Sequence, residues 1–461
     1  MVTSTYTSFD VHGLDRAIAG RAVGPDAPDW DAVRLGWNLA VDHRPAAIAL
    51  PESAADVAAI VDFARTNGLR VAPQGTGHNS HNLEGRLDDT ILVKTSRMRD
   101  VQIDPSRRRA RAEAGTIWTD VTVPAAEHGL AALAGSSPDV GIVGYTLGGG
   151  LSWLSRRYGL AANRVLAIEL VTADGELVRT DREREPDLFW ALRGGGGSFG
   201  VVTAIEFELL PVTQVYAGAA FWPRDRAAEV LSAWRDWTRQ ELPDEIISVG
   251  RLVNVPPLPD IPEPLRGQSF AVVEAIYQGD EAEGARLLAP LRDLGPQMDT
   301  FATIPAVALS HLHMDPEHPV PGKGDGMLLD DAPDGALEAM IAATAPEMGS
   351  TLLSSELRQL GGAIARTEPG QGAVGAIDAA YAMYSVGMTP TPELGTVVEE
   401  QVSAVKEALA PWDADRMYLN FSERPIDARR LYAGDYTYRR LQAVKAAFDA
   451  TDLLQSNHPI A

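Results

Sequence analysis

The sequence predicts an α+β protein whose first and second halves are organised differently. Its 461 residues exceed what one hydrophobic core normally organises, so we expect two or three domains. Near the start, an apolar strand at 45–50, an amphipathic helix at 53–68 and a second strand at 69–73 form a β-α-β unit. Beyond residue 212 strands and helices no longer alternate in this way, and we place the main boundary there.

The residues of the early elements favour the structures that we predict for them. Ser53 can cap the helix at 53–68, and Gly68 can end it. The apolar stripe of this helix consists of Val57, Ile60, Val61 and Ala64. Further strands are predicted at 90–94, 101–104 and 109–115, and a further helix at 117–128.

A glycine-rich stretch later in the first half resembles a dinucleotide-binding motif only superficially. A hairpin is predicted at 165–180, turning at Asp174-Gly175, and a helix, a glycine loop and a strand follow within 185–212. The loop contains a literal G-x-G-x-x-G at Gly195, Gly197 and Gly200. The Rossmann motif requires a strand before the glycines and a helix after them, and here the order is reversed. We therefore exclude a Rossmann site and an NAD-dependent dehydrogenase.

The second half mixes helices and strands without a repeating unit. Helices are predicted at 227–240, 281–295 and 335–344, and strands at 270–279, 359–366 and 375–388. The segment at 304–334 is rich in proline and has low periodicity. The last thirty residues return to a helix and a polar terminal segment, which we expect to pack on the first domain.

Composition limits the classes of partner and of site. The net charge is −23, which argues against a nucleic-acid or an anionic-membrane partner. The absence of cysteine excludes disulfides, thiolate metal sites and iron–sulfur clusters. No secretory signal and no bilayer-length apolar run is visible, so we expect a cytoplasmic protein without a membrane partner.

The stretch "VAPQGTGHNSHN" (71–82) is the first candidate binding loop. A strand leads into Gln74-Gly75-Thr76-Gly77-His78, where small residues let backbone amides approach an anion closely. A phosphate loop normally ends in Lys-Ser/Thr, whereas this one ends in histidine. The imidazole suggests a further chemical role for the loop.

Three more blocks follow in order: "GSSPDVGIVGYTLGGGLSWLSRRYGL" (135–160), "DLFWALRGGGGSFGVVT" (187–203) and a C-terminal "YLNF…YAGDYTYRRLQAVK…FD". Together with the loop, they resemble the berberine-bridge-enzyme-like branch of the vanillyl-alcohol-oxidase/PCMH-type FAD flavoproteins over nearly the whole chain. The resemblance implies a PCMH-type FAD-binding domain of two α/β subdomains (1–212). It also implies a substrate domain with an antiparallel sheet covered by helices (213–415), and a segment (416–461) that returns to the FAD domain.

The resemblance also implies how FAD is held. His78 stands where relatives bond a histidine ring nitrogen to the flavin 8α-methyl, and a neutral imidazole is a suitable nucleophile. Gln74 stands where the family often has arginine, so we expect the pyrophosphate to depend more on backbone amides. His81 is expected at the rim. The predicted cofactor-binding residues are Gln74, Gly75, Thr76, Gly77, His78, Asn79, Ser136, Ser137, Val140, Gly141, Gly144, Gly148, Gly149, Gly150, Gly200, Val202 and Asn420.

Two departures from the family pattern bear on function. Ser137 replaces the cysteine that makes a second flavin bond in many relatives, so the attachment is expected to be single. Val140 matches a position where relatives hold a small residue beside flavin C4a, which favours access for O2. Phe421 replaces the tyrosine base of the "Tyr-x-Asn-Tyr" strand, and no glutamate follows Gly361-Gly362, where another branch places its base.

The remaining candidates for catalysis are Tyr145, Asn420 and Tyr384. Tyr145 is placed to orient substrate or to stabilise charge on the reduced flavin, with core packing as the alternative. Tyr381 and Tyr384 share a predicted strand and should point to opposite faces, so at most one faces the flavin. His311 and His313 would share a face if extended, but no third ligand is evident, and no metal is predicted.

The sequence therefore predicts a FAD-linked oxidase that passes a hydride from a small organic substrate to flavin N5 and electrons to O2, giving H2O2. Loss of the usual base favours an intermediate of secondary metabolism as substrate. Alternatives are a flavin-dependent monooxygenase or oxidative cyclase, a sugar or alcohol oxidase, and a catalytically inactive flavin-binding relative. The protein is expected to be a monomer or a homodimer.

Overall fold

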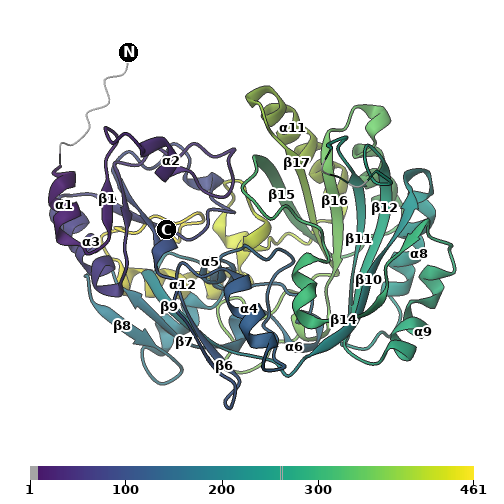
Figure 1. The fold of residues 1–461 in the computed structure, drawn as a ribbon, viewed down its shortest axis with the longest axis horizontal. Helices are drawn as coiled ribbons and strands as arrows, with labels where there is room; N and C mark the ends of the chain where they lie inside the picture. The colour runs from purple at the N-terminus through teal and green to yellow at the C-terminus, as the bar shows by residue number, and fades with distance from the viewer. Residues whose placement is uncertain (1–8, 260, 262) are drawn as a thin grey trace.

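The computed structural model describes residues 9–259, 261 and 263–461, which form three β-sheets with helices packed around them (Figure 1). The strand orders are β1-β2-β4-β3, β5-β6-β9-β7-β8 and β13-β10-β12-β11-β16-β17-β15, with β14 paired to β10. The first two sheets lie side by side at one end of the molecule, and the third occupies the other end. The predicted α+β fold class is confirmed.

The first sheet contains the predicted β-α-β unit. Its parallel strands β2 and β3 both pair with β4, which lies between them. Helix α3 (Ala54–Thr66) connects β2 to β3, and the Ser53 side chain caps it by accepting a hydrogen bond from the Asp56 amide at 3.1 Å. The elements of this region are α1 (Val11–Ala17), β1 (Arg21–Val23), α2 (Trp30–Arg34), β2 (Ala47–Leu50), β3 (Arg70–Gln74) and β4 (Thr90–Lys94).

The second sheet is antiparallel throughout. The predicted hairpin is confirmed as β7 and β8, and the order helix α7, glycines, strand β9 is confirmed as the reverse of a Rossmann motif. Its elements are β5 (Val101–Asp104), β6 (Arg109–Glu113), α4 (Trp118–Ala126), α5 (Ile142–Leu147), α6 (Ser155–Tyr158), β7 (Val165–Val171), β8 (Leu177–Thr180), α7 (Pro186–Leu192) and β9 (Val201–Glu208).

The third and largest sheet is antiparallel, and helices cover one of its faces while the other faces the first two sheets (Figure 1). The helices are α8 (Ala227–Thr238), α9 (Glu281–Arg292), α10 (Asp334–Ala343) and α11 (Pro392–Leu409). The strands are β10 (Gln214–Pro223), β11 (Ile246–Asn254), β12 (Ser269–Tyr277), β13 (Met298–Asp299), β14 (Ala302–Pro305), β15 (Gly322–Leu329), β16 (Leu352–Gln359) and β17 (Tyr381–Met388). None of the helices in the described ranges has the length and apolar character needed to cross a membrane.

Two predictions in the second half differ from the structure. Strand β15 lies in the segment predicted to have low periodicity, because its glycines remove the alternation of side chains: a Cβ on Gly326 would lie 2.8 Å from Phe421. The strand predicted at 359–366 ends at Gln359. Gly361 and Gly362 have φ values of 85° and 57°, which are incompatible with a continuing strand, and a 3-10 turn follows them.

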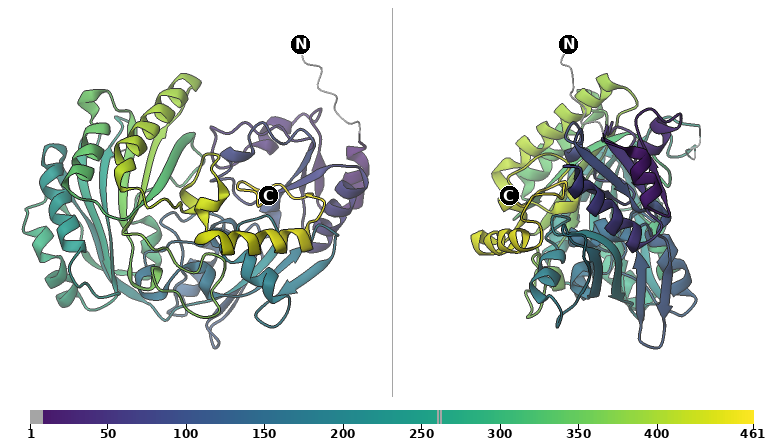
Figure 2. Two further views of the ribbon diagram at one scale, coloured as in Figure 1. Left: turned by 180° about the vertical axis from the view of Figure 1, so that it is seen from behind. Right: turned by 90° about the vertical axis from the view of Figure 1, so that its left-hand side faces the viewer.

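The C-terminal segment packs on the first half of the chain. Helix α12 (Gly434–Phe448) contacts α7 and runs below the C-terminus in Figure 2. The residues after it reach β3, where the Val71 amide donates to the Leu453 carbonyl at 2.9 Å and the Gln455 amide to the Val71 carbonyl at 2.8 Å. This segment therefore extends the edge of the first sheet, next to the loop that follows β3.

Asp449 anchors this C-terminal segment. Its carboxylate accepts hydrogen bonds from the amides of Leu453 (2.7 Å) and Leu454 (3.0 Å), and it also pairs with the buried Lys445 ammonium. We expect Asp449→Ala to lower the free energy of unfolding by about 3 kcal/mol, because it removes the acceptor of two buried amides and leaves the Lys445 ammonium with only the exposed Asp452 carboxylate, 3.1 Å away. Urea unfolding and amide exchange at 453–455 measure the effect.

Asp435→Ala is the matched control, because this exposed α12 carboxylate makes only a 3.8 Å ion pair. It should change the free energy of unfolding by less than about 0.5 kcal/mol. Unchanged amide exchange at 453–455 in Asp449→Ala would contradict the anchoring role.

Candidate active site

The loop after β3 has the backbone geometry that its glycines predict. Gly77 has a φ of 84°, and a Cβ at this residue would lie 3.0 Å from Gly36 Cα. The Trp37 amide donates to the Thr76 carbonyl at 2.8 Å, which fixes the loop against the segment before β2. A Cβ on Gly141 would lie 3.4 Å from Thr76 Cγ2, so the 135–141 segment faces this loop. Two predicted flavin-binding segments therefore lie together.

His78 is held on three sides. Its Nδ1 lies 2.7 Å from Thr76 Oγ1, and its Nε2 lies 3.3 Å from Asp139 Oδ1. The Trp37 ring stacks on the imidazole with centroids 4.1 Å apart, and Trp37 Nε1 donates to the other Asp139 oxygen. Ser137 Oγ also donates to Asp139, at 3.0 Å. Burial by itself would raise the pKa of Asp139, but the contacts with His78, Trp37 and Ser137 hold it below its usual value. The ring therefore rests beside an ionised carboxylate.

Tyr145 and Asn420 form a second wall of the site. The Asn420 side-chain amide donates to the Tyr145 carbonyl and to Tyr418 Oη, both at 3.0 Å. A Cβ on Gly148 would collide with the Asn420 side chain, so this glycine permits the close approach. The 418–421 segment is a 3-10 turn (η9, Leu419–Phe421) and not a strand. The Tyr145 hydroxyl is buried without a hydrogen-bond partner in the described part of the chain.

Tyr384 and Tyr381 lie on opposite faces of β17, as predicted. Tyr381 Oη faces the helices and lies 2.7 Å from Thr238 Oγ1. Tyr384 faces the first two sheets, where its hydroxyl donates to Glu423 Oε1 and its ring lies 4.9 Å from that of Phe421. The other Glu423 oxygen accepts from the Gly324 amide at 3.0 Å and lies 3.4 Å from His81 Nδ1. Burial raises the pKa of Tyr384 well above its usual value, and the Glu423 charge raises it further.

A cluster of buried charges on the same face of the large sheet was missed in the sequence. We call it the buried ion cluster, and it consists of Arg251, Glu274, His313, Glu356 and Arg358. Arg251 lies 2.6 Å from Glu274 and 3.6 Å from Glu356, and Arg358 Nε donates to Glu356 at 2.6 Å. Two features of the sequence could have indicated this cluster. Glu274 is a charged residue within the apolar pattern of β12, and Glu356 and Arg358 stand at alternate positions in β16.

His313 lies between two carboxylates of this cluster. Its Nδ1 is 2.6 Å from Glu274 Oε2 and its Nε2 is 2.8 Å from Glu356 Oε2. Burial and Arg251 would lower the pKa of His313, but the two carboxylates raise it to about 9. His311 is different: it ends the 3-10 helix η5 (Ala306–His311), is exposed, and pairs with Glu317 at 2.8 Å. The two histidines therefore do not share a face, because the segment is not extended.

These contacts join into one continuous path, which we call the contact ring. It runs from His78 through Asp139 and Ser137 to Ser136, whose Oγ lies 3.4 Å from Arg358 Nη2. The Arg358 guanidinium carbon lies 5.1 Å from the Phe421 ring, and Phe421 leads to Tyr384, Glu423 and finally His81. The ring therefore links the 74–82 loop, the 135–141 segment, the 418–423 turn and the polar face of the large sheet.

Several polar atoms around this ring lack a hydrogen-bond partner among the described residues. They are Gln74 Oε1, His78 Nε2, Asn79 Oδ1, both ring nitrogens of His81 and the Tyr145 hydroxyl, all buried. Buried polar atoms are normally hydrogen-bonded, so this concentration indicates a site that binds a polar ligand. Two predicted cofactor residues lie apart from the ring: Val202 is in β9, and Gly200 packs against Leu170 of β7.

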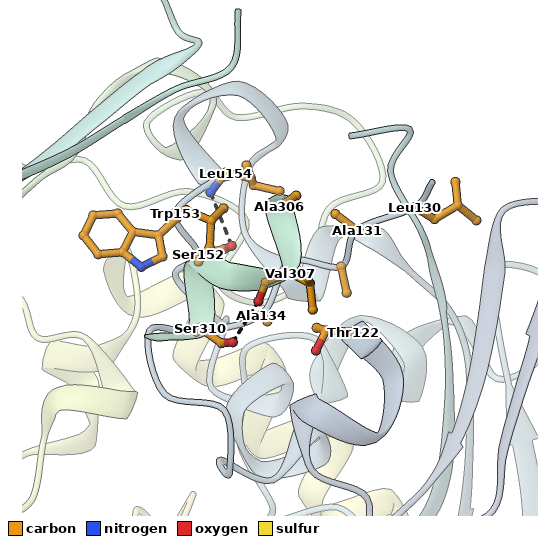
Figure 3. A pocket seen from close by; sticks show the side chains of 13 residues that line it. Thr122, Leu130, Ala131, Ala134, Ser152, Trp153, Leu154, Ala306, Val307 and Ser310 are labelled. Atoms are coloured by element: carbon orange, nitrogen blue, oxygen red, sulfur yellow. Dashed lines mark hydrogen bonds between the residues drawn. The ribbon is translucent and has the colours of Figure 1, made fainter. Parts of the chain in front are cut away.

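Two cavities flank the site. One, of about 20 Å³, lies beside Trp153 and Ser310, where η5 meets the segment after α4, and has room for little more than a water molecule (Figure 3). The other, of about 830 Å³, is lined by α7, by residues 365–378 and by residues 416–440. It shares Tyr418 and Leu419 with the second wall. In the described ranges no group of three or more acidic or histidine side chains could hold a metal ion.

Comparison with known proteins finds similarity to FAD-linked oxidases. A FAD binding domain family matches residues 45–181. The 6-hydroxy-D-nicotine oxidase structure from Arthrobacter nicotinovorans superposes with a TM-score of 0.81 at 26% identity, covering 100% of this chain and 99% of that one. Residues 45–181 thus match a FAD binding domain, and the whole chain has the fold of this oxidase.

Two further similar proteins show where the similarity is concentrated. (R)-6-hydroxynicotine oxidase from Paenarthrobacter nicotinovorans is 38% identical over 207 residues, which is 45% of this chain and 45% of the relative. The chain thus matches about half the length of such curated relatives in sequence. The solved structure of BBE-like 1 from Physcomitrella patens has a TM-score of 0.85 at 21% identity, covering 98% of this chain and 99% of that one. The fold is therefore shared over the full length of this flavoprotein.

We predict a pH-dependent contribution of His313 to stability. Because its folded pKa is raised from 6.5 to about 9, the contribution is fully present below about pH 6.5 and is lost as the pH rises through 9. The free energy of unfolding of the wild type, relative to His313→Gln, should fall by about 3 kcal/mol between pH 6 and 9. Urea unfolding at a series of pH values measures it.

His311→Gln serves as the control, because His311 is exposed and pairs only with Glu317. This variant should follow the wild-type pH profile. If His313→Gln also follows that profile, His313 is not a buried cation.

Proposed function

We propose that the protein is a FAD-dependent oxidase of small organic substrates, with residues 1–212 holding the cofactor and residues 213–415 holding the substrate. The contact ring carries this proposal. It joins the FAD-family segments to the polar face of the large sheet and leaves several buried polar atoms unpaired. A flavin bound there would be reached from one side by the cofactor loops and from the other by side chains of the sheet.

The residues present fit FAD. The 74–79 loop and the 135–150 segment supply closely approaching backbone, and the unpaired atoms of Gln74, Asn79 and Tyr145 can bond a polar ring or its chain. When bound, FAD supplies a two-electron acceptor that takes a hydride from carbon and is reoxidised by O2 to give H2O2. The chain's own task is to orient the substrate and to move its proton.

His78 is the residue that would attach the cofactor covalently. Its Nε2 lies 3.3 Å from Asp139 Oδ1 without a hydrogen bond, and its Nδ1 lies 2.7 Å from Thr76 Oγ1, so a polar group beside each ring nitrogen can influence the tautomer. A relative offers a parallel: glucooligosaccharide oxidase from Acremonium strictum carries a 6-S-cysteinyl, 8α-N1-histidyl FAD, and its structure has a TM-score of 0.80 at 21% identity. Because Ser137 occupies the cysteine position in this chain, the bond through His78 would be single.

Phe421 stands where relatives have a tyrosine that accepts the substrate proton. In this chain Tyr384 and Glu423 together supply a proton acceptor in its place. The Tyr384 ring packs 4.9 Å from that of Phe421, and its hydroxyl already donates to Glu423. A substrate proton can pass to the Tyr384 oxygen while the tyrosine proton moves to the Glu423 carboxylate. Since burial and Glu423 raise the pKa of Tyr384, Glu423 is the final acceptor and Tyr384 relays the proton.

The general test is a substrate screen on protein purified after expression with riboflavin. Oxygen consumption and peroxide formation are measured together over acidic, phenolic, sugar and amine compounds, including intermediates of secondary metabolism. Equal amounts of O2 consumed and H2O2 formed support an oxidase. Consumption of O2 without peroxide would indicate a monooxygenase, and a protein without flavin would refute the proposal.

For covalent attachment, we expect acid-precipitated wild-type protein to stay yellow and its His78 peptide to carry the mass of FAD. His78→Ala should release all flavin to the supernatant, because no cysteine can replace the bond. Asp139→Asn should reduce the attached fraction, because the carboxylate no longer sets the imidazole tautomer. Peptide mass spectrometry measures each fraction.

His128→Gln is the control for attachment, since this exposed histidine follows α4, outside the contact ring. It should keep the full covalent fraction. Flavin in the wild-type supernatant would restrict His78 to a non-covalent contact.

For proton transfer, Tyr384→Phe and Glu423→Gln should each lower the rate of flavin reduction by the best substrate about 10²- to 10⁴-fold, because the relay is broken. Rapid-mixing absorbance under anaerobic conditions measures this rate. Tyr381→Phe, on the opposite face of the same strand, should change it less than about threefold. Equal rates in Tyr384→Phe and the wild type would exclude the relay.

A further inference from the structure

Arg358 is the member of the buried ion cluster that reaches the contact ring. It lies on β16 two residues after Glu356, so both side chains share the face that is turned toward the first two sheets. The guanidinium carbon lies 5.1 Å from the centre of the Phe421 ring, and Nη2 lies 3.4 Å from Ser136 Oγ. Its guanidinium is therefore at the boundary between the sheet and the cofactor loops.

The inner side of this guanidinium is occupied, and its outer side is largely free. Nε donates to Glu356 at 2.6 Å. His313 Nε2 lies 3.3 Å from Nη2, but this nitrogen carries a proton directed at Glu356 and cannot accept a second one. Among the described residues, the long contact with Ser136 is then the one hydrogen bond that the two outer nitrogens, Nη1 and Nη2, make. Because an arginine side chain has five N–H donors, most of this outer edge is unused.

Within the buried ion cluster, the Arg358 cation is the group that faces the site. Glu274 and Glu356 have 0% and 3% of their side chains exposed, whereas Arg358 has 13%. Both carboxylates are engaged by Arg251 and His313 inside the cluster. Among the acidic residues outside the cluster, Asp315 accepts a hydrogen bond from Ser136 Oγ at 3.3 Å, and Asp139 and Glu423 lie toward the two ends of the contact ring, beside His78 and His81. A ligand at the contact ring would therefore meet a guanidinium edge before it meets a carboxylate of the cluster.

We propose that Arg358 binds a carboxylate or another oxyanion of the substrate, so that the site selects acidic organic compounds over cationic amines. This inference rests on the proposed function, because it assigns the substrate class of the same site. The planar guanidinium can donate two parallel hydrogen bonds to a carboxylate, which is the geometry that arginine binds best. The Phe421 ring beside it offers an apolar surface for the carbon skeleton of the same molecule.

The test uses three probes of equal shape and different charge: benzoate, benzamide and benzamidine. Titration calorimetry on the purified protein measures their affinities, and absorbance measures its flavin content separately. We expect benzoate to bind at least about tenfold more tightly than benzamide, and benzamidine not to bind. Arg358→Gln should lose at least about tenfold in benzoate affinity, and Arg358→Lys should lose less, because it keeps the charge without the fork.

Arg184→Gln is the matched control, because the side chain of this exposed arginine makes no ion pair or hydrogen bond with the described residues and lies outside the 830 Å³ cavity, and it should leave benzoate affinity unchanged. Unchanged benzoate affinity in Arg358→Gln, or tighter binding of benzamidine than of benzoate by the wild type, would overturn the proposal. If Arg358→Gln unfolds, the order of the three probes on the wild type decides. A purified protein without flavin would refute the proposed function but not the role of Arg358, because the calorimetry would still measure benzoate binding.

Discussion

Charges buried between the large sheet and the flavin-binding half must be neutralised by one another, and this requirement organises the centre of the molecule. Arg251, Glu274, His313 and Glu356 come from β11, β12, the segment after η5 and β16, and each is almost fully buried. A buried ion without a partner costs several kcal/mol, so these four segments are held in one register. The network also fixes Arg358, whose Nε is bonded to Glu356. The position of Arg358, which we propose binds the substrate, thus depends on charges deeper in the buried ion cluster.

The cofactor side of the site depends on a different constraint, which is close backbone approach. Gly77 and Gly148 lie where a side chain would collide with Gly36 or with Asn420. The C-terminal segment completes this side, because the Asn79 side chain donates to the Ser422 carbonyl at 3.2 Å and the segment after α12 pairs with β3. Residues separated by more than 300 positions in the chain are thereby joined at one loop. The two constraints meet at Ser136, which contacts both Arg358 and Asp315.

Much of the fold could be predicted because its signals are local. The cap at Ser53, the apolar stripe of α3 and the turn at Asp174-Gly175 each act within a few residues, and all appear in the structure. The glycine-rich strand β15 and the short η9 turn could not be predicted, because they pack against each other and against β17, which are distant in the chain. The opposite orientations of Tyr381 and Tyr384 followed from the period of a strand. The Glu423 partner of Tyr384 did not, since it lies 39 residues away.

The sequence by itself determined the match to a FAD binding domain, the glycine-rich loop, the histidine at its end and the absence of a cysteine, because these are properties of residue identity and short spacing. The tertiary structure alone decided which acid stands beside His78, which tyrosine turns to the site and which arginine reaches it. Those outcomes depend on strand register and on the pairing of buried charges. In the sequence, a carboxylate such as Glu356 looks like any polar residue of a strand, and only the tertiary structure buries it away from water. Its charge must then be balanced by groups that are distant in the chain.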